Sequence, residues 1–457
     1  MAISIWIKKP HEGGAIVKYS RRPEFDTADD KLTFLSEVKL REIKFSEIIA
    51  DPKNTWLNLS KNDFDSLIPL AEKKTKLAKN ASEERSLFKL YSLGVKTNRD
   101  EWVCDDSREQ LEAKTKFLFK NYESESKRLL GNVDKKNVAG SIKYNIKWTR
   151  KLKRLLVQGA KIRFDKAKIV QSLYRPFAVK QLYFANELNE DQYQLRQVFF
   201  EQEQNELICI SGVPGNKSFQ VLATHSLYHH DTLEKTQCLP LYRYDDHGKR
   251  TDNITDWGLA QFREHYKDKK ITKEEIFHYV YGVLHDPKYR KKYELNLKRE
   301  FPRIPFYADF RKWAKWGKTL MDLHIGYETV KPYPGLKLTT AKPLPRPLPQ
   351  VGGEKDSVPK AKLKADKETG MITLDERTWL EGIPAAAWDY KLGNRSALEW
   401  ILDQYKEKTP KDPTIREKFN TYKFEDYKEK VIDLLQRVTS VSVKTMEIMG
   451  EMEKEAS

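Results

Sequence analysis

Apolar and polar side chains alternate at the start of the chain. In residues 3–8 an isoleucine occupies every second position, which is the period of a β-strand. Residues 10–14 (PHEGG) have the composition of a turn, and residues 15–19 (AIVKY) predict a returning strand. An isolated two-stranded hairpin is marginally stable in water, so we expect this N-terminal β-hairpin to belong to a larger sheet. The pattern therefore predicts that the chain begins inside a sheet whose other strands are missing.

The hydrophobic period changes along the rest of the chain. Residues 62–94 and 106–131 predict charge-rich helices, whereas residues 168–241 contain short β-rich runs that are broken by Pro and Gly. Helical spacing returns over residues 255–327. The predicted fold class is therefore α/β (mixed α+β), rich in helices and with short β-sheet segments.

A stretch dense in Pro, Gly and Lys interrupts this pattern at residues 331–367. It offers few apolar groups, so we predict an exposed linker or insertion. Its PLPRPLP run could bind a partner that recognises polyproline, but we favour a plain low-complexity insertion. The final segment predicts a compact unit with one strand and two helices. The predicted domains are 1–55, 56–330, the linker 331–367, and 368–457.

The composition predicts a class of binding partner and a cellular compartment. Among 457 residues, 84 Lys and Arg face 67 Asp and Glu, and the net charge of +17 favours a polyanionic partner. The three cysteines (Cys104, Cys209 and Cys238) have no CxxC spacing, which predicts a reducing compartment without a disulfide framework or zinc ribbon. We find no apolar run of membrane-spanning length and no signal peptide, so we expect a cytoplasmic protein with no membrane partner.

Catalytic motifs fail when their spacing is tested. Residues 212–218 superficially resemble a phosphate-binding loop, but Asn216 replaces its glycine and Pro214 removes an N–H, so a turn is predicted. A group comprising Cys238 and residues 225–231 (three histidines and an aspartate) lacks zinc-site spacing and predicts a hydrogen-bonded loop. No glycine-rich loop for S-adenosylmethionine and no [DNS]PP[YFW] motif occurs. We therefore predict neither a catalytic nor a metal site.

Basic residues cluster more informatively. Across residues 143–168, ten Lys and Arg face one acidic residue. Residues 146–156 predict a helix whose apolar positions fall on one side and whose basic positions fall on the other. A solvated surface helix is the alternative to phosphate contact. The residues predicted to contact DNA phosphates are Lys147, Arg150, Lys151, Lys153 and Arg154.

Loop residues are the candidates for contact with base edges. The segment 94–103 presents Lys96, Asn98 and Arg99 on a small loop, and Tyr174 lies beside Arg175. Arg and Asn are the side chains that pair with bases through two hydrogen bonds. The turn near 212–218 is a further candidate. For Tyr174, burial in the core is an equally good interpretation.

Several motifs occur in an order that identifies a family. They are GVKTNRDEWV (94–103), IKWTRKLKR (146–154), YRPF (174–177), QLYF (181–184), ITDWGLAQFREHY (254–266), ITKEEIFHYVYGVLHDPKYRKKYELNLKREFPRIPF (271–306), GIP (382–384) and LGNRSALEW (392–400). Together they resemble the C-terminal specificity domain, or target-recognition domain, of type ISP restriction–modification enzymes. The resemblance extends from about residue 56 to residue 445, and the linker interrupts it.

The resemblance implies recognition of double-stranded DNA. In that family one polypeptide joins a nuclease, a helicase-like ATPase, a coupler, an N6-adenine methyltransferase and this domain. Residues 1–55 would then be the C-terminal strands of a truncated methyltransferase domain. S-adenosylmethionine, ATP and Mg belong to the parent enzyme, and no cofactor is expected in this chain.

The predicted function is sequence-specific DNA recognition for an adenine-specific restriction–modification system that serves in phage defence. Two origins fit: a separate specificity subunit that works with methyltransferase and helicase chains, or a remnant of a longer gene. Two alternatives in function stay open. The chain could be a non-catalytic scaffold for partner subunits, or part of an adenine-specific DNA methyltransferase that another chain completes.

Overall fold

The computed structural model describes residues 16–23, 26–49, 62–129, 137–200, 204–215, 217–341 and 359–455. The chain divides into two compact units, residues 1–62 and residues 63–457. The predicted boundary after residue 55 and the predicted strand in residues 3–8 lie outside the described residues. Within the described residues, no helix is long and apolar enough to cross a membrane.

The first unit contains a small antiparallel sheet. Strand β1 (Val17–Tyr19) pairs with β2 (Ser46–Ile48), and helix α1 (Ala28–Glu37) lies between them in the chain. Thr27 caps this helix, because its hydroxyl accepts a hydrogen bond from the Asp30 N–H at 3.1 Å. The predicted returning strand thus exists at residues 17–19, and the partner that the structure gives it is β2.

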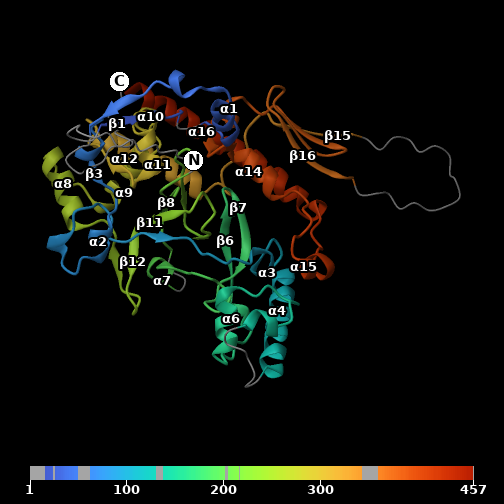
Figure 1. Cartoon of the computed structure of the whole chain (residues 1–457). Coiled ribbons are helices and arrows are strands. Elements are labelled where there is room, and N and C mark those ends of the chain that lie inside the picture. The colour runs from blue at the N-terminus through green and yellow to red at the C-terminus, as the bar shows by residue number, and fades with distance from the viewer. Residues whose placement is uncertain are drawn as a thin grey trace. The chain divides into compact units, whose positions relative to one another are not determined.

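One four-stranded sheet of the second unit carries the loops that the sequence singled out. Its order is β10-β6-β7-β5, in which β6 and β7 form an antiparallel hairpin and β10 runs parallel to β6. Helices α4 and α6 lie at one end of this sheet (Figure 1). The bounds are β5 (Cys104–Asp105), β6 (Ile169–Arg175), β7 (Ala178–Tyr183), β10 (Leu227–Tyr228), α3 (Asp100–Val103), α4 (Arg108–Arg128), α5 (Val138–Ser141), α6 (Arg150–Val157) and α7 (Leu195–Val198).

A second four-stranded sheet has the order β4-β11-β8-β9, and most of its side chains are buried. All side chains of β8 and β9 are buried, which explains why every residue of the two strands except Thr224 is apolar. Two short antiparallel pairs flank the sheet in the chain, β12 with β13 and β3 with β14. The bounds are β4 (Ser92–Leu93), β8 (Leu207–Ile210), β9 (Val221–Thr224), β11 (Gln237–Pro240), β12 (Tyr242–Tyr244), β13 (Arg250–Asp252), β3 (Ile68–Pro69) and β14 (Arg303–Ile304).

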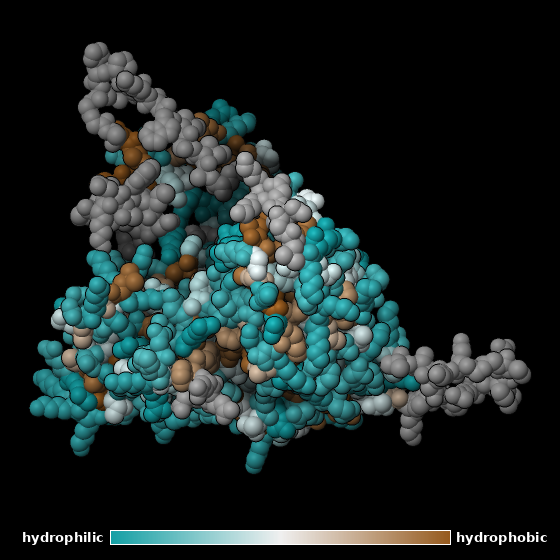
Figure 2. All heavy atoms as spheres, turned by 90° about the horizontal axis from the view of Figure 1, so that it is seen from below, coloured by the Kyte–Doolittle hydropathy of each residue, from teal (hydrophilic) through white to brown (hydrophobic). Residues whose placement is uncertain are grey.

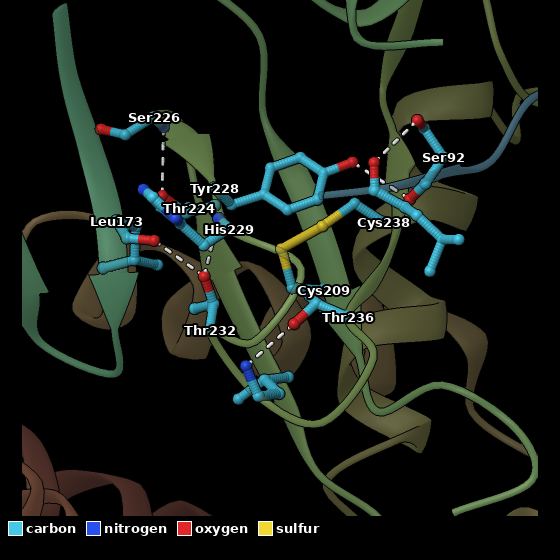
Figure 3. The surroundings of a disulfide bond; sticks show 12 residues. Ser92, Leu173, Cys209, Thr224, Ser226, Tyr228, His229, Thr232, Thr236 and Cys238 are labelled. Atoms are coloured by element: carbon cyan, nitrogen blue, oxygen red, sulfur yellow. Dashed lines mark hydrogen bonds between the residues drawn. A yellow bond between two sulfur atoms is a disulfide. The ribbon is translucent and has the colours of Figure 1, made fainter. Parts of the chain in front are cut away.

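The central sheet corrects one expectation from sequence. Cys209 and Cys238 form a disulfide between β8 and β11 (Figure 3), although the cysteine spacing predicted no disulfide. The antiparallel register places these two residues directly opposite each other. Strand register brings them together across a sequence separation of 29 residues, and sequence spacing does not reveal register.

Helices pack tightly behind the central sheet. In α9, eight consecutive residues (276–283) are buried. A Cβ on Gly317 of α12 would lie 1.8 Å from the carbonyl oxygen of His278 in α9, so only glycine permits this approach. The bounds are α2 (Lys73–Leu77), α8 (Asp256–Tyr266), α9 (Lys273–Val283), α10 (Pro287–Lys292), α11 (Glu294–Arg299) and α12 (Phe310–Ile325).

The C-terminal part adds a third four-stranded sheet, in the order β15-β18-β17-β16. Both ends of the predicted linker belong to this sheet: β15 covers Lys337–Thr340 and β16 covers Ala361–Asp366, where Leu363 is 1% exposed. Residues 342–358 lie outside the described residues. The other bounds are β17 (Met371–Asp375), β18 (Thr378–Glu381), α13 (Ala386–Asp389), β19 (Lys391–Leu392), β20 (Arg395–Ser396), α14 (Ala397–Gln404), α15 (Pro413–Lys418) and α16 (Lys428–Glu455).

The second unit closes around shared apolar clusters. One cluster joins Trp102 and Leu182 to Leu398 and Val441, so the C-terminal segment completes the same core as the N-terminal part. A second cluster surrounds Phe277 and contains residues of α9 and α12. The mixed α/β class that the sequence predicted is confirmed.

Candidate nucleic-acid interface

Helix α6 begins later than its hydrophobic period predicted. Thr149 is the N-cap residue, and its hydroxyl accepts a hydrogen bond from the Leu152 N–H at 3.4 Å. Leu152 and Leu156 are buried, and Trp148 is buried just before the helix, where its Nε1 donates to the carbonyl oxygen of Lys143 at 2.8 Å. The apolar side of the predicted helix is therefore docked.

Four of the five basic residues predicted here project from this docked helix or its leading turn. Lys147, which precedes the helix, and Arg154 are exposed. The Arg150 side chain is 91% exposed, and its Nε lies 3.4 Å from Glu190. Lys153 is half-buried, with its Nζ 5.6 Å from the centre of the Tyr144 ring. These groups can reach phosphates without leaving their positions on the fold.

The fifth basic residue, Lys151, forms hydrogen bonds within the protein. Its Nζ donates to Asn186 Oδ1 at 2.8 Å and to the carbonyl oxygens of Asn189 and Glu190 at 2.9 and 3.4 Å. All three ammonium protons are thereby used, and burial lowers the pKa of Lys151. This lysine bonds the 186–190 loop to α6, which is a positioning role, and its contact with a phosphate stays a prediction.

Arg99 is also directed inward. It is 4% exposed, and its Nη2 donates to the hydroxyl of Thr149, the N-cap of α6. Burial lowers the pKa of its guanidinium to about 10. Direct contact with a base needs a side chain that reaches solvent, so this geometry favours a link between the 94–99 loop and α6. Sequence periodicity cannot show this, because the two segments meet only through tertiary packing.

Three of the other predicted residues line one hollow of about 370 Å³. Lys96 and Asn98 come from the 94–99 loop and Arg175 comes from the end of β6, while His230 and Asp231 complete the polar wall. The backbone of Lys96 is paired with that of Asp191 through hydrogen bonds of 2.9 and 3.1 Å. Asn98 is exposed and has φ +56°, a left-handed conformation that Asn tolerates. The hollow therefore presents hydrogen-bond donors and acceptors on anchored backbone.

A chain of contacts orients Arg175 at this hollow. Its guanidinium carbon lies 4.2 Å from the centre of the Tyr174 ring, and its Nη1 donates to the Tyr174 carbonyl oxygen at 2.7 Å. The Tyr174 hydroxyl donates to Asp100 Oδ2 at 2.9 Å, and burial raises the pKa of this phenol well above its usual range. Tyr174 is thus a largely buried platform that orients the Arg175 guanidinium.

His229 forms the floor beneath this chain. Its Nε2 lies 3.0 Å from the Ser172 hydroxyl oxygen, and burial lowers the pKa of the imidazole to about 4. Its backbone N–H donates to Thr232 Oγ1, which in turn donates to the Leu173 carbonyl oxygen (Figure 3). The neutral histidine and the tied turn keep His230 and Asp231 in position, where the two side chains pair at 2.9 Å. The sequence analysis predicted a hydrogen-bonded loop here, and the contacts of His229, His230 and Asp231 form one.

Within the described residues, one group of side chains has the spacing needed to coordinate a metal ion. The candidate ligand atoms of Asp100, Cys104 and His229 lie within 4.8 Å of one another. However, the Asp100 carboxylate already accepts hydrogen bonds from Thr97 and Tyr174, and the His229 imidazole bonds Ser172. Hydrogen bonding accounts for the carboxylate and the imidazole, so this group carries no metal assignment.

The turn at residues 212–218 is tied down by backbone contacts. The N–H of Gly212 donates to the Glu234 carbonyl oxygen at 2.7 Å, and that of Gly215 donates to the Lys298 carbonyl oxygen at 2.8 Å. Asn216 lies outside the described residues. Since these N–H groups already have acceptors, they are not arranged as a phosphate cradle.

Solved structures of DNA-bound enzymes share this architecture. The chain is 48% identical to the protein in a cryo-EM structure of a DrdV–DNA complex, with a TM-score of 0.85 over 95% of this chain and 43% of that one. It is 29% identical to a nuclease-deletion mutant of the type ISP restriction–modification enzyme LlaGI in complex with a DNA substrate mimic, with a TM-score of 0.78. That match covers 96% of this chain and 39% of the other.

A third structure, the ATP-dependent type ISP enzyme LlaBIII bound to DNA, is 28% identical with a TM-score of 0.71. This match covers 89% of the present chain and 25% of LlaBIII. The chain therefore spans less than half the length of these relatives. A comparison with curated proteins finds no match.

The fold defines a class of protein. The chain matches one portion of type ISP restriction–modification enzymes, in which small sheets and helices have the same arrangement. The model of the type ISP C-terminal specificity domain matches residues 86–434. The chain belongs to this family. The resemblance seen in the ordered motifs is confirmed.

Proposed function

We propose that this chain recognises a specific sequence in double-stranded DNA for a type ISP restriction–modification system. The observation that carries the proposal is the match to a DrdV–DNA complex over 95% of the chain at 48% identity. The family model, which is that of a specificity domain, supports the same conclusion. A function of this kind would be exercised in the cytoplasm, as the sequence led us to expect.

The geometry supports two different kinds of DNA contact. The exposed basic groups of Lys147, Arg150, Lys153 and Arg154 suit phosphates, because ten basic residues face one acid between residues 143 and 168. The hollow around Arg175 suits base edges, because it holds donors and acceptors in fixed positions. The basic groups would set affinity, and the hollow would set sequence preference.

The decisive experiment selects bound fragments from a pool of random duplexes and then measures affinity against salt. We expect enrichment of one sequence motif. For about four phosphate contacts, log K should fall against log salt with a slope of roughly −3 or steeper. An affinity that does not change with salt and a pool without enrichment would contradict the proposal and favour a scaffold that binds only protein subunits.

We further propose that the chain has no catalytic activity by itself and needs no cofactor to bind DNA. The family model describes a specificity domain, whereas S-adenosylmethionine, ATP and Mg are the cofactors expected of the parent enzyme. Binding of duplex DNA should therefore survive in EDTA without nucleotide or S-adenosylmethionine. Transfer of a labelled methyl group to DNA by the purified chain would contradict this proposal and favour a methyltransferase role.

Methyltransferase and helicase chains of the same system are the proposed protein partners. The chain covers 25–43% of its structural relatives, and those relatives include an ATP-dependent enzyme. Mixing the chain with such partner chains should restore sequence-directed methylation. Co-sedimentation without restored methylation would leave assembly and function uncoupled and would count against this part of the proposal.

A further inference from the structure

The β12–β13 hairpin carries polar groups that neither the sequence analysis nor the proposed site uses. It is a two-stranded sheet of its own, and all three residues of β13 are exposed. Isolated hairpins of this kind are marginal in water, so other contacts must hold it in shape. Figure 1 shows it at the lower edge of the second unit, on the side where α4 and α6 also project, with α7 between them.

Two buried asparagines anchor the root of this hairpin. Asn205 Nδ2 donates to the Tyr242 carbonyl oxygen at 2.8 Å, and its Oδ1 accepts from the Tyr242 N–H at 3.1 Å. Asn253 Nδ2 donates to the carbonyl oxygens of Pro240 and Leu90 at 2.8 and 2.9 Å. The hairpin therefore projects from a fixed base.

The tip is equally well defined. Asp245 Oδ1 accepts hydrogen bonds from the N–H groups of His247 and Lys249, both at 2.9 Å. Gly248 has φ +79°, and a Cβ there would lie 2.3 Å from the Phe200 ring, which stacks on Tyr244. These contacts define the conformation of the tip, and a preorganised tip suits discrimination between similar ligands.

The hairpin borders a hollow of about 260 Å³. Arg243, Asp246 and Gln197 of α7 are among the residues that line it. The Nε of Arg243 is buried and has no hydrogen-bond acceptor among the described residues. Asp246 is exposed, and the described residues offer no partner for its carboxylate in the form of a hydrogen bond or ion pair. An unused donor and an unused acceptor thus lie at one hollow.

Charge distinguishes this hairpin from the basic helix. Residues 242–252 contain three Arg or Lys and three Asp, so the ribbon has no net charge, unlike residues 143–168. A neutral ribbon gains little from phosphates, and exposed carboxylates are repelled by them. A two-stranded ribbon fits the major groove of B-DNA, where donors and acceptors of bases are displayed and carboxylates accept from cytosine N4.

The hairpin also continues the proposed interface. Helix α7 packs against β12, and the 186–190 loop, which precedes α7 in the chain, is bonded to Lys151 of α6. The side of the molecule that includes these elements is hydrophilic over most of its described surface (Figure 2). Duplex DNA that contacts α6 would therefore find the ribbon on the same side.

We infer that the β12–β13 hairpin enters the major groove of duplex DNA and that Asp246 accepts a hydrogen bond from the N4 amino group of a cytosine. This inference rests on the proposed function, because it assigns a further specificity determinant to the same DNA-bound state. The hairpin contributes to sequence preference and little to affinity for random DNA.

The test compares the sequence motifs that the wild-type chain and its variants select from random duplexes. Asp246→Ala should lower the preference for cytosine at one motif position by about 10-fold and spare the other positions. Asp246→Asn should shift that position toward adenine, which pairs with an asparagine amide. Asp252→Asn, which removes an equal charge from the same hairpin, is the matched control and should leave the motif unchanged. Unfolding midpoints equal to that of the wild type verify the fold.

Three outcomes would overturn the inference. The Asp246 variants could select an unchanged motif, or they could change every position together. Alternatively, Asp252→Asn could have the same effect as Asp246→Asn, which would show a charge effect and no base contact. If the wild-type chain selects no motif at all, the proposed function itself fails, and this result is distinguishable from the other three.

Discussion

The basic helix α6 and the hollow around Arg175 use charged residues in opposite ways. On α6, the Arg150 side chain is 91% exposed, and its one ion pair among the described residues is with Glu190 at 3.4 Å. At the hollow, Arg175 lies on the Tyr174 ring, and Tyr174 is bonded to Asp100. Exposed cations suit a uniform polyanion, whereas oriented groups with fixed neighbours suit discrimination. The difference teaches that the partners of a charged side chain matter more to its role than its charge.

The largest effect is expected when the exposed basic groups are removed together. Substitution of Lys147, Arg150, Lys153 and Arg154 with Ala should weaken binding to every duplex on the order of 100-fold or more at 0.1 M salt. The salt slope should flatten by about one unit per lost contact. Binding titrations at several salt concentrations measure both quantities. If the variant loses sequence preference but keeps the salt slope of the wild type, then α6 contacts bases. The roles assigned to α6 and to the hollow around Arg175 would then be reversed.

Acid should act on the hollow through its buried histidine. Burial lowers the pKa of His229 to about 4, below its ordinary value near 6.5, so the unfolded chain binds a proton that the folded chain rejects. The stabilisation is present above pH 6.5 and is lost as the pH falls toward 4. About 2 kcal/mol should disappear between pH 7 and pH 5.

The matching variant is His229→Gln, whose free energy of unfolding should depend less on pH by that amount. Urea unfolding at both pH values gives the comparison. His324, which is also buried with a pKa near 3, is present in both proteins and cancels. Equal pH dependence of the two proteins would mean that His229 is already accessible to protons in the fold.

Lys151 and Lys153 sharpen the comparison within a single helix. Lys151→Met removes three hydrogen bonds to the 186–190 loop and should lower the free energy of unfolding by about 1–2 kcal/mol. Lys153→Met should change stability by less than about 0.5 kcal/mol and should flatten the salt slope. Chemical unfolding and salt titrations separate the two roles. If the salt slope of the Lys151→Met variant is also flatter, Lys151 contacts a phosphate as the sequence analysis predicted.

Tyr174→Phe should change recognition with a modest effect. The ring under Arg175 is retained, but the 2.9 Å hydrogen bond to Asp100 is lost, which is worth about 1 kcal/mol. Preference for the selected sequence over random DNA should fall about 5-fold, while random affinity stays unchanged. Tyr144→Phe on the basic side is the control, since Tyr144 is exposed. Competition assays measure this preference. If the two variants have equal effects, the proposed difference between the hollow around Arg175 and the basic side of α6 is wrong.

The smallest effect should come from residues 342–358, which belong to neither region. Because β15 and β16 flank them, only this stretch, and not the whole of 331–367, can be shortened. Replacement by about ten residues should change the free energy of unfolding by about 0.5 kcal/mol, since closure entropy depends weakly on loop length. A drop of many degrees in the melting temperature would show that the stretch is packed.

Local pattern predicted much of what local interactions control. The apolar side of α6 is buried as its spacing indicated, and Thr149 is a recognisable N-cap once the first turn is known. The prediction of a linker was wrong at residues 337–340 and 361–366, because these segments, which are rich in Lys and Thr, form strands. In β15 no side chain is buried, so the partner strand β18 selects the extended conformation and composition does not.

By itself the sequence determined the family, the mixed α/β class and the excess of positive charge, because each depends on residue types in order along the chain. Only the tertiary structure decided which cations are free. It directs Arg99 inward to Thr149 and Lys151 to the 186–190 loop, while Arg175 is placed beside Lys96 and Asn98. The physical reason is that the availability of a charged side chain depends on its neighbours in space, and packing between distant segments supplies those neighbours.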